Sequence, residues 1–249
     1  MATIAIGDVH GQRPQLEDLV DQIEPTLVAG DTVVFLGDYI DRGPDTRGCV
    51  DVILRFIEAS CADIVCLRGN HEDWMLRARR DHQHHSWLLG MDAVETIASY
   101  SHDVASTLEI AQRQAGLSLY TEQVSLPYDL FFTCLPEAHL RFFDSLRESH
   151  QTGDAFCAHA GVDPAVGDLA TQSPRALVWG EGMFPIGYGG ETIVVYGHRN
   201  NAVIDAAGWP RPRVLGRTIG IDTIAHGVLT AVRLPDGHVF QSARGARRA

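Results

Sequence analysis

The chain has 249 residues, 45% of them hydrophobic and 21% charged, which suits one large globular domain or two small ones. Its 20 basic and 32 acidic residues give a net charge of −12, which argues against a broad nucleic-acid-binding surface. No apolar segment is long enough to span a membrane, and five cysteines without a CxxC spacing indicate reduced thiols. We therefore expect a cytoplasmic protein without a membrane partner.

The first part of the chain alternates between predicted strands and predicted helices. Short apolar runs predict buried strands at Thr3–Ile6, Thr32–Leu36 and Ile64–Leu67. Apolar residues at helical spacing predict helices over residues 14–23 and 46–59, between these strands. Strand–helix–strand units of this length form parallel sheets with right-handed crossovers.

Each of these three strands ends in a glycine-containing turn that carries polar residues. The turns are Gly7-Asp8-Val9-His10-Gly11, the stretch Gly37 to Gly43, and Gly69-Asn70-His71-Glu72. Asp38 follows Asp8 by 30 residues, and Asn70 follows Asp38 by 32. Because the carboxyl ends of neighbouring parallel strands meet at one edge of a sheet, we expect these side chains to lie together there.

The middle of the chain has a different pattern. Helical spacing dominates from Glu72 to about His150, with predicted helices at Trp87–Ile97, Val104–Ala115 and Glu137–Leu146. We expect residues 73–150 to form a helical insert within a single domain that spans residues 1–249. This insert would cover the site and select the substrate.

The strand pattern then resumes. Strand-like runs at Asp154–Ala158 and Thr192–Tyr196 end in His159-Ala160-Gly161 and Gly197-His198. Three further strands are predicted at the end of the chain, and the Asp236-Gly237 pair is typical of a hairpin turn between the last two.

Five strand ends therefore present six side chains that can bind metal ions, namely Asp8, His10, Asp38, Asn70, His159 and His198. A mixed set of carboxylates, an amide and imidazoles suits Mn, Fe or Zn better than Ca or Mg. Six ligands are too many for one open catalytic ion, so we predict two divalent metal ions that share Asp38 as a bridge. Mn²⁺ is the expected metal, with Fe or Zn as the alternatives.

The remaining polar residues of the turns have predicted roles in phosphate chemistry. Two metal ions can activate water for in-line attack at phosphorus and neutralise the phosphoryl oxygens. We predict attack by a metal-bridging hydroxide, with His71 as the general acid and Asp41 as the carboxylate that orients it. Arg42 and Arg68 are the predicted phosphate-binding residues.

These motifs, in this order, resemble the phosphoprotein phosphatase family of metallophosphoesterases. The resemblance implies an α/β fold, a calcineurin-like β-sandwich flanked by helices, with a dinuclear centre between the sheets. It also implies metal roles for the six side chains just named, an acid pair of His71 and Asp41, and phosphate contacts for Arg42 and Arg68.

Within the family, the chain looks like the small bacterial serine/threonine phosphatases. Relatives that cleave diadenosine tetraphosphate symmetrically often lack an acid at the position of Asp41 and have Asp at that of Glu72. We therefore predict hydrolysis of phosphomonoesters, above all phosphoserine and phosphothreonine in proteins. The alternatives are hydrolysis of dinucleoside polyphosphates or RNA 5′ ends at the same site, and a pseudo-enzyme that binds phosphoprotein without turnover.

One departure from the family concerns phosphate binding. Many members carry a further arginine just after a Leu-Trp pair, before the last histidine motif. Here Val178-Trp179 is followed by Gly180-Glu181, and the nearest arginine is Arg175. Phosphate affinity or substrate choice is therefore expected to differ from that of typical members.

Overall fold

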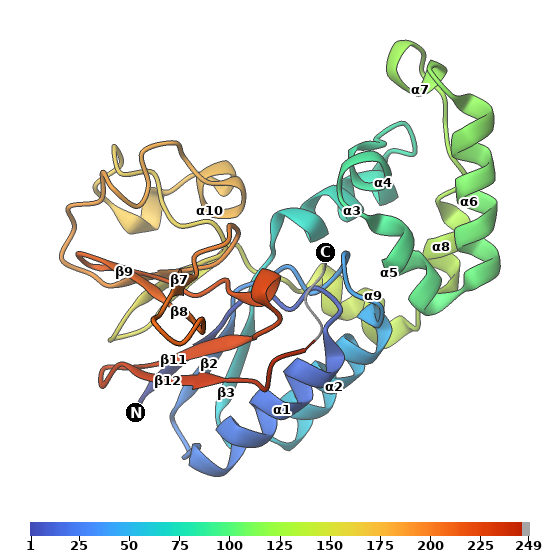
Figure 1. The fold of residues 1–249 in the computed structure, drawn as a ribbon. Coiled ribbons are helices and arrows are strands. Elements are labelled where there is room, and N and C mark those ends of the chain that lie inside the picture. Colours follow the sequence, from blue (N-terminus) through green and yellow to red (C-terminus); the bar gives the residue numbers. More distant parts are fainter. Residues whose placement is uncertain (246–249) are drawn as a thin grey trace.

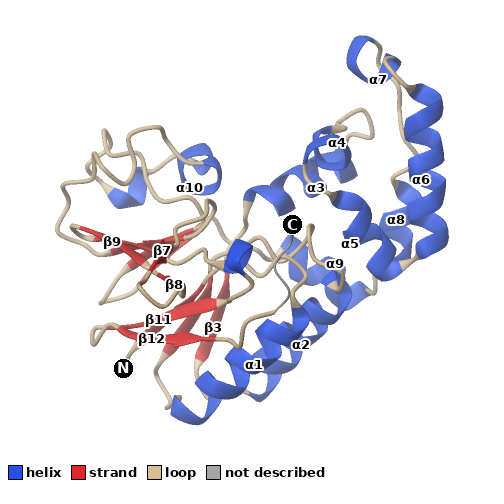
Figure 2. Ribbon diagram, in the orientation of Figure 1, coloured by secondary structure: helices blue, strands red, loops and turns tan. Residues whose placement is uncertain are grey.

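The computed structural model describes residues 1–245 and has two five-stranded sheets stacked in a sandwich, with helices on the outside (Figures 1 and 2). The first sheet has the strand order β12-β11-β1-β2-β3, and the second has the order β4-β5-β6-β10-β9. A separate pair of short strands, β7 and β8, lies outside both sheets. This architecture confirms the α/β sandwich that the sequence predicts.

The first sheet is built on three parallel strands, β1 (Thr3–Ile6), β2 (Thr32–Phe35) and β3 (Asp63–Cys66). The predicted hairpin is formed by β11 (Thr230–Leu234) and β12 (His238–Gln241), and it adds antiparallel strands beside β1. Helices α1 (Arg13–Ile23) and α2 (Thr46–Ala59) make the crossovers between the parallel strands and cover one face of this sheet.

The two faces of the first sheet pack into two different cores. Ile4 and Ile6 of β1 and Phe35 of β2 point into the core under α1 and α2. Ala5 and Val34, the residues between them, point into the core between the two sheets. This alternation follows from the period of two along a strand and explains why these strands are apolar throughout.

The second sheet is shorter and closes the sandwich. Its strands are β4 (Ser149–Gln151), β5 (Phe156–Ala158), β6 (Val194–Tyr196), β9 (Arg213–Leu215) and β10 (Thr218–Gly220). Strands β5, β6 and β10 run parallel to one another. Helix α10 (Pro174–Trp179) packs on the outer face of this sheet. The pair of β7 (Val203–Ile204) and β8 (Pro210–Arg211) precedes β9 in the chain.

Seven helices lie between β3 and β4 and form the arm at the upper right of Figure 1. They are α3 (Asn70–Arg80), α4 (Ser86–Gly90), α5 (Ala93–Tyr100), α6 (His102–Ala115), α7 (Ser118–Thr121), α8 (Asp129–Cys134) and α9 (Glu137–Asp144). The prediction of a single helix at residues 87–97 is wrong. The chain forms two helices there, α4 and α5, and they are separated at Asp92, which adopts a left-handed conformation (φ 55°). The apolar side chains of this arm continue the core that lies under α1 and α2.

All five cysteines are free, in line with the predicted reduced thiols. Among residues 1–245, no helix is long and apolar enough to cross a membrane.

Candidate metal centre

The candidate ligands stand on the loops that follow β1, β2, β3, β5 and β6, and these loops are tied together by backbone hydrogen bonds. The amides of Val9 and His10 both donate to the carbonyl of Asp38, at 3.1 and 2.7 Å, and the amide of Gly197 donates to the carbonyl of His159 at 2.8 Å. Of the six described non-glycine residues with positive φ, five are predicted site residues, namely His10, Asp38, Asp41, Arg42 and His198. Backbone strain of this kind is concentrated at functional sites.

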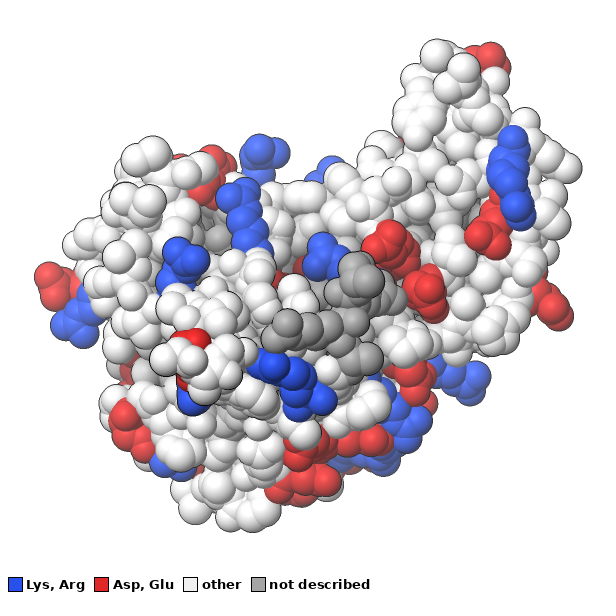
Figure 3. Space-filling view, in the orientation of Figure 1, with Lys and Arg blue, Asp and Glu red and all other residues white. Residues whose placement is uncertain are grey.

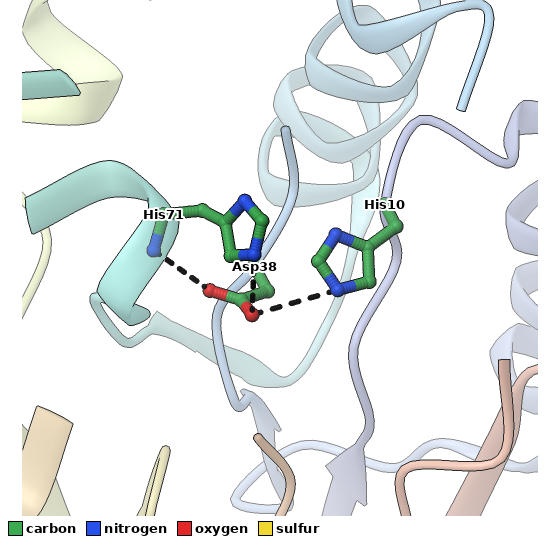
Figure 4. Close-up of side chains that lie close together, drawn as sticks. All are labelled: His10, Asp38 and His71. Atoms are coloured by element: carbon green, nitrogen blue, oxygen red, sulfur yellow. Dashed lines mark hydrogen bonds and ion pairs between the residues drawn. The ribbon is translucent and has the colours of Figure 1, made fainter. Parts of the chain in front are cut away.

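Asp38 lies at the centre of the site. Its carboxylate belongs to two groups of potential ligand atoms, each within 4.8 Å of one another: one with His10 and His71, the other with Asp8 and His159. Figure 4 shows the rings of His10 and His71 next to each other, both beside this carboxylate. One carboxylate oxygen, Asp38 Oδ2, is buried and has no hydrogen-bond partner among the described residues. A carboxylate that two groups share in this way has the position of a bridging ligand.

The ring of His10 is held so that one nitrogen lone pair faces the site. Nδ1 lies 2.9 Å from the carbonyl oxygen of Ile40, so Nδ1–H donates to that carbonyl. Nε2 is therefore the unprotonated nitrogen, 3.5 Å from Asp38 Oδ2, and it accepts a hydrogen bond from Arg42 at 3.0 Å. A metal-binding histidine is commonly fixed in this way by a carbonyl behind it.

The second side of the site brings together three atoms that can each offer an electron pair, His198 Nδ1 doing so when its ring proton is on Nε2. His159 donates from Nδ1 to the carbonyl of Leu36 at 3.0 Å, so its Nε2 carries a lone pair. This Nε2 lies 3.0 Å from the amide oxygen Oδ1 of Asn70 and 3.2 Å from Nδ1 of His198. His198 Nδ1 is 2.9 Å from the same oxygen. Three electron-pair donors at these distances fit a cation placed among them.

The protonation states support the same interpretation. Burial lowers the pKa values of His10 and His159, and it lowers the pKa of His198 to about 3, so these imidazoles are neutral near pH 7 and able to bind a cation. Burial acts to raise the pKa of Asp38, but the nearby imidazoles, His159 first, lower it below its usual range. Burial, followed by Asp222 and Asp38, raises the pKa of Asp8. Carboxylates this close together repel one another, and bound cations would offset that repulsion. The six residues thus fit the two divalent ions predicted.

Two glycines leave the room that the carboxylates need. A Cβ atom at Gly69 would lie 2.0 Å from Asp38 Oδ1, and one at Gly197 would lie 2.0 Å from Asp8 Oδ1. Gly69 also precedes α3, whose N-terminus faces Asp38, and the amide of His71 donates to Asp38 Oδ1 at 3.2 Å. The partial positive charge at this helix end favours the carboxylate.

His71 and Asp41 form a buried pair beside the cluster. His71 Nδ1 lies 2.7 Å from Asp41 Oδ2, and both side chains are fully buried. The other ring nitrogen, Nε2, has no partner among the described residues and lies 3.8 Å from Asp38 Oδ2. Burial acts to lower the pKa of His71, but Asp38 and then Asp41 raise it overall. Burial raises the pKa of Asp41 too, and its hydrogen-bond donors, His71 first, oppose that rise.

Two residues of the helical arm hold Asp41 in place, and sequence reasoning did not find them. Thr96 Oγ1 donates to Asp41 Oδ1 at 2.7 Å and accepts from the Asp41 amide at 2.7 Å. The indole Nε1 of Trp87 lies 3.0 Å from Asp41 Oδ2. In the sequence, Thr96 and Trp87 look like ordinary helix residues. Contacts between residues so far apart in the chain leave no local pattern that could reveal them.

Glu72 and Asp222 are two further acidic residues whose roles the sequence did not reveal. The buried carboxylate of Glu72 accepts hydrogen bonds from the amides of Asp38, Tyr39 and Gly69 at 2.8 to 3.0 Å, and so joins the loops after β2 and β3. Burial raises its pKa to about 8. Asp222 follows β10 and repeats the pattern of an acid after a strand, which is the signal that could have found it; burial raises its pKa to about 6.

The two predicted phosphate-binding arginines lie in different surroundings. Arg42 contacts His10 and lines a cavity of about 500 Å³ whose wall also includes His198. Arg68 instead points to acidic residues outside the cluster. Its Nη2 is 2.7 Å from Glu148, and its Nε is 3.9 Å from Asp73. The structure thus brings Arg42 to the cluster, whereas Arg68 is held by carboxylates.

A sandwich with histidines, carboxylates and an amide converging at the strand ends, beside a buried His–Asp pair, defines a metal-dependent phosphoesterase. The family model of the calcineurin-like phosphoesterases matches residues 1–227, and the chain belongs to this family. Members of the family use divalent metals. The predicted resemblance to the metallophosphoesterases is confirmed.

Individual relatives point to more than one substrate. The asymmetrical bis(5′-nucleosyl)-tetraphosphatase of Geobacillus thermodenitrificans is 26% identical in sequence, and the alignment covers 93% of this chain and 89% of that protein. Serine/threonine-protein phosphatase 1 of Salmonella typhimurium is 34% identical over a shorter alignment, which covers 34% of this chain and 36% of that protein. Other curated relatives match over 25% and as little as 7% of their own length. Among solved structures, that of a proposed diadenosine tetraphosphatase has a TM-score of 0.61 at 21% identity and covers 98% of this chain and 95% of its own.

Proposed function

We propose that the protein hydrolyses phosphoester or phosphoanhydride bonds directly, with two divalent metal ions and His71 as the general acid. The observation that carries this proposal is the buried Asp41–His71 pair, whose free nitrogen faces the shared carboxylate Asp38. Asp8, His10, Asp38, Asn70, His159 and His198 would hold the ions. When bound, the ions supply charge neutralisation on the phosphoryl oxygens and lower the pKa of the attacking water.

His71 would deliver the proton to the leaving group. Its Nδ1–H is engaged by Asp41, so the proton that it can release is the one on Nε2. The raised pKa of His71 favours the protonated ring near neutral pH. Asp41 stabilises that imidazolium and fixes its orientation, and Nε2–H then protonates the departing oxygen as the bond to phosphorus breaks. Arg42, on the wall of the cavity, would bind the substrate phosphate.

The substrate is a separate proposal. Relatives that align over 93% of the chain include tetraphosphatases, and this favours a dinucleoside polyphosphate. The presence of Asp41 and Glu72 favours phosphoserine and phosphothreonine, and the serine/threonine phosphatase matches about a third of the chain. We propose the dinucleoside polyphosphate as the substrate that the full-length likeness supports, with phosphoprotein as the second candidate.

One experiment tests both the proposed hydrolysis and the proposed substrate. It compares phosphate release from a phosphothreonine peptide with cleavage of diadenosine tetraphosphate, with Mn²⁺ present and the nucleotide products identified. Faster turnover of the nucleotide would support the first substrate, and faster release from the peptide the second. Absence of turnover on both, in protein shown to contain two metal ions per chain, would contradict the hydrolase proposal and favour the non-catalytic alternative.

A further inference from the structure

We propose that Arg199 and Arg213 form an anion-binding track that leads away from the metal centre and holds the additional phosphates of a polyphosphate chain. The proposal rests on the proposed function, in which Arg42 and the metal site take the phosphate that reacts. It adds a binding site for the phosphates that do not react, and so names the substrate class as one with several linked phosphates.

The track is formed by two cavities that share part of their walls. The first, about 500 Å³, is lined by His10, Arg42 and His198 of the site, and also by Arg199 and Asn200. The second, about 220 Å³, again includes His198, Arg199 and Asn200, and it continues to Arg213 on β9. Arg42 lines the first cavity, Arg199 the wall that both share, and Arg213 the second, so the three arginines span two adjoining cavities that begin at His10 and His198.

These three arginines have no carboxylate partner within 4.0 Å among residues 1–245, whereas arginines close by are paired. Arg175, Arg211 and Arg217 lie 3.8, 2.9 and 4.0 Å from Glu181, Asp205 and Glu191, respectively. The chain has 32 acidic residues against 20 basic ones and contains no lysine, so unpaired guanidinium groups in two adjoining cavities are unexpected. On the face shown in Figure 3, basic side chains stand near the hollow between the sandwich and the arm.

The other polar groups of the two cavities limit where an anion can lie. Glu181 is in the wall of the second cavity, but it is paired with Arg175. Asp92 and Asp222 are in the wall of the first. Tyr196 lines the second cavity, and its buried hydroxyl has no hydrogen-bond partner among the described residues. A phosphate beyond the reacting one would therefore meet Arg199 and Arg213, with the phenol of Tyr196 as a further donor.

Arg199 also offsets the missing family arginine. At that position the chain has Gly180, which adopts φ 82° and lies close enough to His198 for a Cβ atom to sit 4.0 Å from the ring. Gly180 brings no charge to the centre. Arg199 directly follows His198 and faces both cavities, so it returns a guanidinium to this side of the site. Guanidinium groups bind phosphate oxygens in a bidentate manner.

The test is calorimetric titration of the Mn²⁺-loaded protein with inorganic tripolyphosphate and with orthophosphate, in a His71→Asn background that prevents turnover. The quantity compared is the ratio of the two affinities. Each of Arg199→Gln and Arg213→Gln is expected to lower the preference for tripolyphosphate by about tenfold, the usual size of a hydrogen bond to a charged group. Arg217→Gln, which removes an arginine that is paired with Glu191 and lines neither cavity, is the matched control and should leave the ratio unchanged.

An unchanged ratio in both variants, with circular dichroism spectra like that of the parent, would overturn the track. Titration with ATP separates the two sources of a phosphate chain. Affinity equal to that for tripolyphosphate identifies the phosphates alone as the ligand, and higher affinity adds a nucleoside contact to them. Failure of the proposed function can be told apart from failure of the track. If the wild-type protein does not hydrolyse p-nitrophenyl phosphate, the proposed function fails, while the ratio of the two affinities can still be measured.

Discussion

The loops at the strand ends and the helical arm differ in how firmly their residues are placed. At the strand ends, the site residues are buried, several have left-handed backbone, and the loops are joined by hydrogen bonds. At the tip of the arm, Leu117 and Tyr120 are 81% and 71% exposed, and α7 projects away from the body of the molecule (Figure 1). The two regions meet where Thr96 and Trp87 contact Asp41. The chemistry is therefore expected to depend on the strand ends, and access of larger substrates on the arm.

The largest expected effect comes from Asp38→Asn, which removes the carboxylate that both ligand groups share. Activity should fall close to the uncatalysed background, because bound metal ions supply several kcal/mol of charge stabilisation. Metal content by elemental analysis should fall together with turnover. Asp92→Asn, in the wall of the cavity that His10 and His198 also line but outside both ligand groups, is the control and should retain both metal content and turnover. Near-normal turnover by the Asp38 variant would contradict the bridging role.

The next effect is that of His71→Asn. Metal content should persist, and turnover of alkyl phosphates should fall about 10²–10⁴-fold, the usual contribution of general acid catalysis. Aryl phosphates have better leaving groups and should lose less. The ratio of the two losses is the measurement, and equal losses would rule out His71 as the proton donor.

A smaller effect is expected where the arm supports the site. Thr96→Val keeps the shape of the side chain but leaves the buried Asp41 amide without its acceptor. Unfolding free energy should fall by about 1–3 kcal/mol, the cost of an unsatisfied buried group. Turnover should fall by about tenfold, in the range of supporting contacts around a site. Thr107→Val, whose hydroxyl bonds to its own helix at the exposed side of α6, is the control for both urea unfolding and kinetics. Equal behaviour of the two variants would mean that the arm does not support the acid pair.

The smallest effect is expected at the tip. Leu117→Ser should change the unfolding free energy by less than about 0.5 kcal/mol, as is usual for exposed positions. Hydrolysis of p-nitrophenyl phosphate should be unchanged. A large loss of p-nitrophenyl phosphate hydrolysis would contradict the distinction between the strand ends and the arm, because it would show that the tip affects the chemistry itself.

The strand ends were predictable because the signal there is local. Apolar runs of four or five residues, each followed by glycine and a polar residue, predicted β1, β2 and β3 and the convergence of Asp8, Asp38 and Asn70. Strands β7, β8 and β9 were not predicted, because they are only two or three residues long and largely exposed, too short to form the apolar run that marks a core strand. The link from Thr96 to Asp41 spans 55 residues, and no local pattern encodes it.

The hydrogen bonds of Glu72 have a consequence for how the protein acquires its ions. One buried carboxylate holds backbone amides of the loops after β2 and β3 at once, through atoms that are not among the proposed metal ligands. We therefore expect the loops that carry Asp38 and Asn70 to keep their arrangement when the ions leave. Little loop ordering then opposes metal uptake, so ions can be exchanged in the folded chain, and chelation should remove activity reversibly while leaving the fold in place.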